Sequence, residues 1–200
     1  MSDTQNRSDH APIAAGDCAE RNKALSLRET PTLRGFARPA ASADGRSHRE
    51  GAKGASLARG VRNRNPLNIR FAQANDWQGK LTADENTDDG CAFEQFEDAV
   101  FGLRAAIRLI RKHHRHGATT IRRLATIWAP PGENPHLDAY IRTVARHAAI
   151  DADTALDLSR DAHLRPVLLG MIRAENGTQP YDDTTIDTAL ALAAGPRVAV

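Results

Sequence analysis

Apolar residues recur at intervals of three and four over most of the second half of the chain, and this interval is typical of amphipathic helices. The clearest stripe follows Asp98 and consists of Val100, Leu103, Ala106, Ile107 and Ile110. Arginine and lysine largely occupy the other faces of the same segment. The spacing therefore predicts a helix that ends at Gly117, since glycine is a common helix stop.

Cap and stop signals predict further helices after this one. Thr119 or Thr120 can cap a helix that stops before the two prolines at 130–131. The Asn-Pro pair at 134–135 predicts the cap and first turn of the next helix. Each of these segments carries its own apolar stripe, so we expect the helices to pack against one another.

Two more helices complete the expected pattern. One begins at about Asp161 and ends at Asn176 and Gly177, and a weaker one covers residues 182–194. The runs 68–71 and 91–96 are short, and Asp, Gly and Thr separate them, as in a small hairpin. The sequence therefore predicts a mainly α fold, an α-rich domain with a small β hairpin.

The first quarter of the chain has a different composition. Residues 1–57 are rich in Ser, Ala, Arg, Asp and Gly and contain few large apolar residues. Such a segment cannot bury enough apolar surface to offset the entropy cost of ordering it. We therefore expect a disordered N-terminal arm over 1–57, a folded domain over 58–194 and a tail over 195–200.

Length and charge narrow the class of protein. The chain has 200 residues, of which 40% are hydrophobic, and this is enough for one domain of ordinary size. A formal net charge of +2 makes nucleic acid an unlikely partner. We expect no membrane span and no signal peptide, hence synthesis in the cytoplasm and a separate route to the periplasm or cell wall.

Residues 59–71 contain three asparagines around Pro66, a pattern too polar for a core. Pro66 fixes its own φ and favours an extended Asn65, while asparagine side chains bond nearby backbone. The segment therefore predicts a shaped loop that displays amides. It is equally typical of a structural turn, and its sequence neighbours, among them Trp77, favour a sugar-binding cleft.

Glu175 is the candidate acid. It follows an apolar stripe and lies in the last turn of its predicted helix, where unpaired carbonyls and the nearby core disfavour a negative charge. Both effects raise the carboxyl pKa, which suits a general acid for glycosidic cleavage. On spacing alone, a solvated helix end is an equally good interpretation. The other candidate carboxylates are Glu94, Glu97, Asp98 and Glu133.

Metal chemistry is not indicated. The histidines around His114 are adjacent in sequence, so they point in different directions on a helix, and no carboxylate cluster accompanies them. Two cysteines are too few for a zinc site. We therefore expect no metal and no cofactor.

Residues 174–181, AENGTQPY, resemble the stretch that ends the catalytic helix of goose-type lysozymes and lytic transglycosylases, in which the glutamate is the general acid. Residues 65–70, NPLNIR, with the helix that follows, resemble a segment of bacterial glucosaminidases of the same superfamily. There the segment comes after the catalytic helix, whereas here it comes first. The resemblance implies a lysozyme-like domain that is circularly permuted, a rearrangement that nearby termini allow.

Residues 59–181 also resemble a family of phage and prophage proteins labelled virion structural proteins, which includes lytic enzymes of phage particles. Two positions depart from these patterns. Leu67 replaces the glycine that usually follows the proline, and Asn176 replaces the serine after the glutamate. Leu67 in particular is expected to alter the backbone that approaches substrate.

The resemblance implies a peptidoglycan-cleaving enzyme of lytic transglycosylase or muramidase type, with Glu175 as its single general acid. A transglycosylase needs no second carboxylate, because the acetamido group of the substrate can stabilise the positive centre. Trp128 and Tyr140 could stack on sugar faces, but both fall on the apolar stripes of their helices, which favours the core. The residues implied to bind the glycan are Asn65, Asn68, Arg70, Trp77 and Tyr181.

Two rival functions remain open from the sequence. The first is a peptidase of the same fold that cleaves the peptides of the same polymer. The second is a non-enzymatic structural protein of the virion or chromosome, with phage particle components or phosphates as partners. Its basic face would consist of Arg104, Arg108, Arg111, Lys112, Arg115, Arg122 and Arg123.

Overall fold

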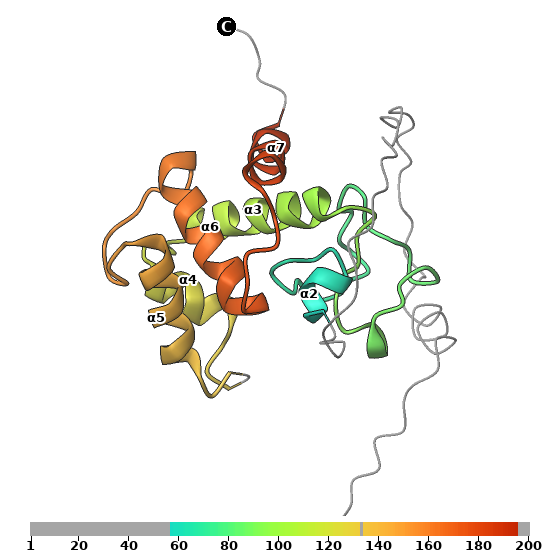
Figure 1. The fold of residues 1–200 in the computed structure, drawn as a ribbon, viewed down its shortest axis with the longest axis horizontal. Coiled ribbons are helices and arrows are strands. Elements are labelled where there is room, and N and C mark those ends of the chain that lie inside the picture. Colours follow the sequence, from blue (N-terminus) through green and yellow to red (C-terminus); the bar gives the residue numbers. More distant parts are fainter. Residues whose placement is uncertain (1–56, 133, 196–200) are drawn as a thin grey trace, which may run out of the picture.

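The computed structural model describes residues 57–132 and 134–195 (Figure 1). The arm and tail expected at the two ends lie outside the described residues, except for Leu57 and Gly195, and so does Glu133. The described part is mainly helical, as the periodicity predicts. Its helices are α2 (Arg59–Arg62), α3 (Ala99–Arg115), α4 (Ile121–Trp128), α5 (Leu137–Ala148), α6 (Asp161–Asn176) and α7 (Asp183–Ala193), with a 3-10 turn at Asp89–Cys91.

Helix α3 carries the apolar stripe predicted after Asp98 and packs against α7 and α4. α7 lies along α3, and α5 packs against α6 and α4 on the other side of the molecule (Figure 1). The irregular segment between α2 and α3 covers the remaining end of α3. Within the described ranges, twenty-seven buried apolar residues, from Leu67 to Ala193, form one continuous core. The helical faces thus bury their stripes together, which is the main source of stability in such folds.

Side chains and a glycine mark several helix ends, among them the predicted cap at Thr120 and the predicted stop at Gly177. The Asp98 carboxylate accepts from the Val100 amide at 2.8 Å, and the Thr120 hydroxyl accepts from the Arg123 amide at 3.1 Å. α6 stops at Gly177, whose φ of 71° is the left-handed conformation that glycine adopts readily. These side chains satisfy backbone groups that a helix end leaves unpaired.

The expected cap at Asn134 is wrong. α5 begins at Leu137 with His136 at its N-cap position, and the Asn134 side chain accepts from the His136 amide at 2.9 Å instead. The asparagine therefore closes a turn ahead of the helix, an alternative use of the same side-chain oxygen. The start of the 59–71 segment also differs from expectation, since it forms the single turn of α2.

The expected hairpin is not formed as strands. The described residues contain only two isolated antiparallel bridges, Arg70 with Phe93 and Lys80 with Phe96. Asn68 and Cys91 have φ values of 49° and 48°, so neither run begins in an extended conformation.

Asparagine side chains make hydrogen bonds to backbone carbonyls in place of many of the backbone hydrogen bonds that a β-hairpin would have. Asn65 Nδ2 donates to the carbonyls of Ile69 and Glu94, both at 2.9 Å, and Asn86 Nδ2 donates to the Phe93 carbonyl at 2.9 Å. The segment is therefore rigid without being a sheet.

Helix α3 packs directly against the asparagine-rich loop. A Cβ on Gly102 would lie 2.1 Å from the carbonyl oxygen of Arg64 and 3.0 Å from Cδ of Pro66. Only glycine, which has no Cβ, permits this approach. Gly102 therefore allows the backbone of the loop to contact the helix directly. None of the helices in the described ranges is both long and apolar enough to cross a bilayer.

Candidate active site

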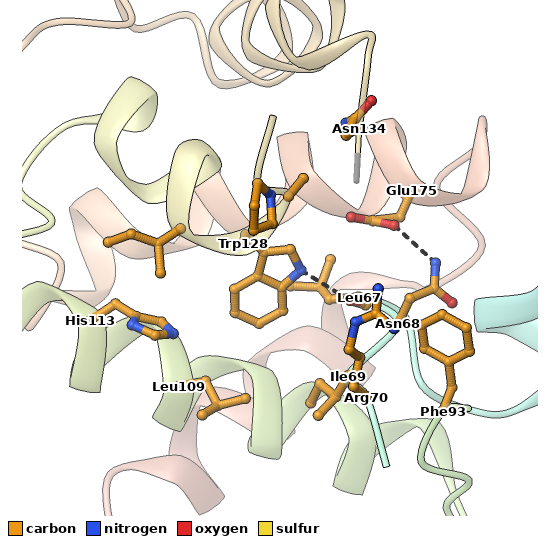
Figure 2. Close-up of a pocket in the computed structure, with 13 residues that line it drawn as sticks. Leu67, Asn68, Ile69, Arg70, Phe93, Leu109, His113, Trp128, Asn134 and Glu175 are labelled. Carbon is orange, nitrogen blue, oxygen red and sulfur yellow. Dashed lines mark hydrogen bonds between the residues drawn. The ribbon is translucent and has the colours of Figure 1, made fainter. Parts of the chain in front are cut away.

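A cleft of about 480 Å³ lies between the 67–70 loop, the C-terminal half of α3 and the ends of α4 and α6. Glu175 lines it near the end of α6, with Asn68 and Arg70 on the facing loop (Figure 2). Three of the six residues expected at the site thus meet in one cavity, although 107 residues separate Asn68 from Glu175 along the chain. The cleft therefore forms only where these distant segments come together in the folded protein.

Glu175 is held by one direct hydrogen bond. Asn68 Nδ2 donates to Oε2 of Glu175 at 2.9 Å (Figure 2). Burial raises the pKa of the Glu175 carboxyl above its ordinary value, and the contacts with Asn68 and Tyr140 oppose this rise. The result is a partly buried carboxyl that faces a cavity and favours its protonated form more than a solvated glutamate does.

Tyr140 lies on the buried face of α5, with its hydroxyl close to Glu175. Burial, and then the charge of Glu175, raise the pKa of Tyr140 well above its ordinary value. The Tyr140 hydroxyl makes no well-formed hydrogen bond to any group in the described ranges. Its interaction with Glu175 is therefore mainly electrostatic. Tyr140 packs in the core and also touches the acid.

The loop that carries Asn68 is fixed by its own side chains. Asn65 is fully buried, and its Oδ1 accepts from the Ile69 amide at 2.9 Å while its Nδ2 donates to two carbonyls. Asn65 therefore shapes the loop and does not line the cleft. Asn68 adopts φ of 49°, a left-handed conformation that asparagine tolerates better than most residues.

The loop is also tied to the helices that form the cleft walls. Asn176 Nδ2 donates to the Pro66 carbonyl at 2.8 Å, and Trp128 Nε1 donates to the Leu67 carbonyl at 3.0 Å. A Cβ on Gly60 would lie 2.6 Å from Oδ1 of Asn176, so α2 fits closely against the same turn. Consequently the acid and its amide partner belong to one rigid unit.

Trp128 of α4 and His113 of α3 also line the cleft (Figure 2). Their rings meet edge to face with centroids 6.3 Å apart. Burial, with the charges of Lys112 and His116, lowers the pKa of His113. The apolar stripe of the sequence favoured the core for Trp128, and the histidines at 113–116 were considered and rejected as metal ligands. His113 lies one helical turn after Leu109, which also lines the cleft. This spacing places both side chains on the same face of α3 and could have assigned His113 to the cleft.

Trp77 and Tyr181 do not line the cleft. Both are partly buried and pack against the core instead. Burial and the nearby charge of Asp98 raise the pKa of Tyr181 to about 12. Spacing alone does not distinguish an aromatic side chain that faces a cleft from one that covers a core.

Glu175 is the carboxylate that the described residues contribute to the cleft. Glu94 is fully buried elsewhere, 3.1 Å from Lys80 Nζ, and it accepts from the Ala72 amide. Glu97 is exposed, and Asp98 caps α3. In the part of the chain that the structure describes, no three potential ligands gather as a metal site.

Replacing Glu175 with glutamine is expected to make the protein relatively more stable as pH rises. The folded-state pKa lies above the unfolded one, so folded protein binds the proton more tightly and wild-type stability falls as pH rises through that window. Glutamine cannot ionise. The melting temperature of Glu175→Gln minus that of wild type should therefore increase from pH 4 to pH 8, and a constant difference would contradict the pKa direction.

One comparison with known proteins covers more than half of the chain. The chain is 34% identical over 125 residues to Protein P5 of Pseudoalteromonas phage PM2, which covers 62% of this chain and 74% of that protein. Among models of known protein families, none matches the chain. This identity, over about three quarters of the phage protein, is high enough to show common ancestry. The chain therefore belongs to the family of Protein P5 of Pseudoalteromonas phage PM2.

Proposed function

We propose that this chain is a peptidoglycan-cleaving enzyme of phage or prophage origin, with a lysozyme-like domain that is circularly permuted. The observation that carries the proposal is Glu175, a carboxyl whose pKa is raised by burial and which Asn68 aims into a cleft beside Trp128. A carboxyl whose pKa is raised keeps its proton more readily and can donate it to a leaving oxygen. The phage relative supports the source.

Glu175 acts as the general acid. It donates its proton to the glycosidic oxygen between two amino sugars as the bond to that oxygen breaks, and positive charge develops on the sugar ring left behind. Asn68 holds the carboxyl in position and accommodates the carboxylate that forms. In a transglycosylase the substrate's acetamido oxygen first bonds the anomeric carbon, and the sugar's own C6 hydroxyl then displaces it and gives its proton to the Glu175 carboxylate. In a muramidase a water molecule attacks the anomeric carbon and returns the proton to Glu175.

The cleft has two kinds of wall, which suits an amino-sugar strand. Ile127, Trp128 and Pro130 offer apolar surface, and Asn68 and Arg70 offer polar groups on the other side. Sugar rings have apolar faces and polar edges, so such a pair of walls can hold them in one orientation. We place Asn68 and Arg70 against acetamido and lactyl groups.

The family assignment supports action from a phage particle, and we propose that the protein reaches the cell wall as a component of the virion. The same relative leaves a non-enzymatic virion protein as the second candidate. A nucleic-acid surface is the weaker version of that candidate, because Arg111 and Arg122 on the basic face pair with Asp161 and Asp153.

The test is product formation from purified peptidoglycan. Wild-type protein is expected to release soluble muropeptides, and mass spectrometry of the sugar ends distinguishes anhydro products of a transglycosylase from reducing ends of a muramidase. Cleavage within the peptides would favour the peptidase. Failure to release any product from sacculi of several species would favour the structural protein over the enzyme.

A further inference from the structure

A row of contacts leads through the cleft from the candidate acid to a histidine of α3. Asn68 Nδ2 donates to Glu175, and the carbonyl of the preceding residue, Leu67, accepts from Trp128 Nε1 at 3.0 Å. The ring of Trp128 in turn meets the ring of His113, with centroids 6.3 Å apart. All five residues line the cleft, and Trp128 is seen between His113 and Glu175 in Figure 2. The cleft therefore continues past the acid to a second polar group.

His113 and the histidine next to it have different surroundings. Nε2 of His114 lies 3.2 Å from the Asp157 carboxylate, so this ring ties α3 to the segment before α6. In the part of the chain that the structure describes, the ring of His113 makes no hydrogen bond and no ion pair. His113 is half-buried and lines the cleft, so its ring nitrogens are available to a ligand.

The surroundings of His113 favour its neutral ring. Burial, followed by the charges of Lys112 and His116 on the same helix, lowers the pKa of His113. The ionisable residues that line the cleft from other segments are Arg70, which stays cationic, and Glu175, whose own raised pKa favours the neutral carboxyl. A neutral imidazole has one nitrogen that accepts a hydrogen bond, whereas an imidazolium has none.

Apolar side chains accompany this ring in the cleft. Leu109 lies one helical turn before His113, and Ile127 and Trp128 line the cleft from α4. The indole N–H of Trp128 is already bonded to the Leu67 carbonyl, so Trp128 offers a ligand ring surface and no donor. An acceptor beside apolar surface matches an acetamido group, which combines an N–H donor with a methyl group. A sugar hydroxyl has no such methyl group.

We propose that His113, with Leu109 and Trp128, forms a second amino-sugar subsite, in which the imidazole accepts from an acetamido N–H and the apolar side chains cover the acetyl methyl group. This inference rests on the proposed function and adds that the glycan is also recognised through a sugar that does not react. Contacts with such a remote sugar can orient the scissile bond against the acid.

The test measures binding to full-length protein that carries Glu175→Gln, which prevents cleavage and removes the titration of the acid from the cleft. The probes are chito-oligosaccharides, and cello-oligosaccharides of the same length, which carry a hydroxyl in place of each acetamido group. Protonation of His113 removes the acceptor, so the affinity for chito-oligosaccharides should fall about fivefold between pH 7.5 and pH 4, as loss of one hydrogen bond provides. A hydroxyl can donate or accept, so the affinity for cello-oligosaccharides should stay constant.

His113→Gln in the same background should bind chito-oligosaccharides equally well at both pH values, because glutamine keeps an acceptor and does not titrate. The control is His147→Gln, an exposed histidine on α5 outside the cleft, and it should keep the pH dependence. The subsite is overturned if pH affects both probes equally or if His113→Gln leaves the dependence unchanged, and the proposed function then still stands. Absence of oligosaccharide binding also overturns the subsite, and together with absence of peptidoglycan cleavage by wild type it overturns both.

Discussion

Glu175→Gln is expected to lower the rate of glycan cleavage by about 1,000-fold, the usual contribution of a positioned general acid. Glutamine nearly matches glutamate in size and can keep a contact with Asn68, but it has no proton to donate at ordinary pH. The rate is measured as soluble muropeptide released per unit time from purified sacculi. Circular dichroism checks that the variant keeps its helices.

Glu97→Gln is the matched control, because Glu97 is exposed and lies outside the cleft. It should cleave at the wild-type rate. If both variants cleave equally well, the acid has been assigned to the wrong residue. If only Glu175→Gln loses activity while its melting curve stays cooperative, the loss belongs to chemistry and not to folding.

Gly102→Ala is expected to have the largest effect on stability. Its new methyl group would lie 2.1 Å from the Arg64 carbonyl oxygen, and backbone cannot move aside as a flexible side chain does. Overpacking of this kind costs about 3 kcal/mol of unfolding free energy, which outweighs the roughly 1 kcal/mol that alanine gains over glycine inside a helix. Urea denaturation of both proteins measures the difference.

Gly132→Ala separates this clash from the general effect of the substitution, since nothing lies within 4 Å of the position of its Cβ. Its unfolding free energy should stay within about 0.5 kcal/mol of wild type. A similar value for Gly102→Ala would mean that α3 and the loop can move apart. In that case the loop would not hold Asn68 as firmly as the contact distances indicate.

The helices could be predicted because their signals are local. The stripe after Asp98, the cap at Thr120 and the stop at Gly177 each depend on residues within a few positions of one another. The position of Glu175 at the end of α6 could be predicted for the same reason. Its raised pKa follows from burial next to that helix end, as the apolar stripe before it indicates.

The predictions that were wrong concern residues whose partners are far away in the sequence. Asn65 was expected to meet substrate, yet its side chain bonds the Glu94 carbonyl 29 residues later and replaces a strand ladder. Trp77 was expected in the groove and packs on the core. The Asn176 amide that ties α6 to Pro66 spans 110 residues, and no spacing rule predicts such a bond.

The residues of the candidate site come from two parts of the chain that are far apart in sequence. Asn68, Arg70 and Trp128 are synthesised before residue 133, whereas Tyr140 and Glu175 come after it. Contacts over such long sequence separations form slowly, because a large loop must close before they contribute any stability. A nascent chain that still lacks α6 has no acid and no anchor for Pro66. The proposed lytic activity therefore requires α6 to be in place, and growing chains that lack this helix are not expected to cleave peptidoglycan.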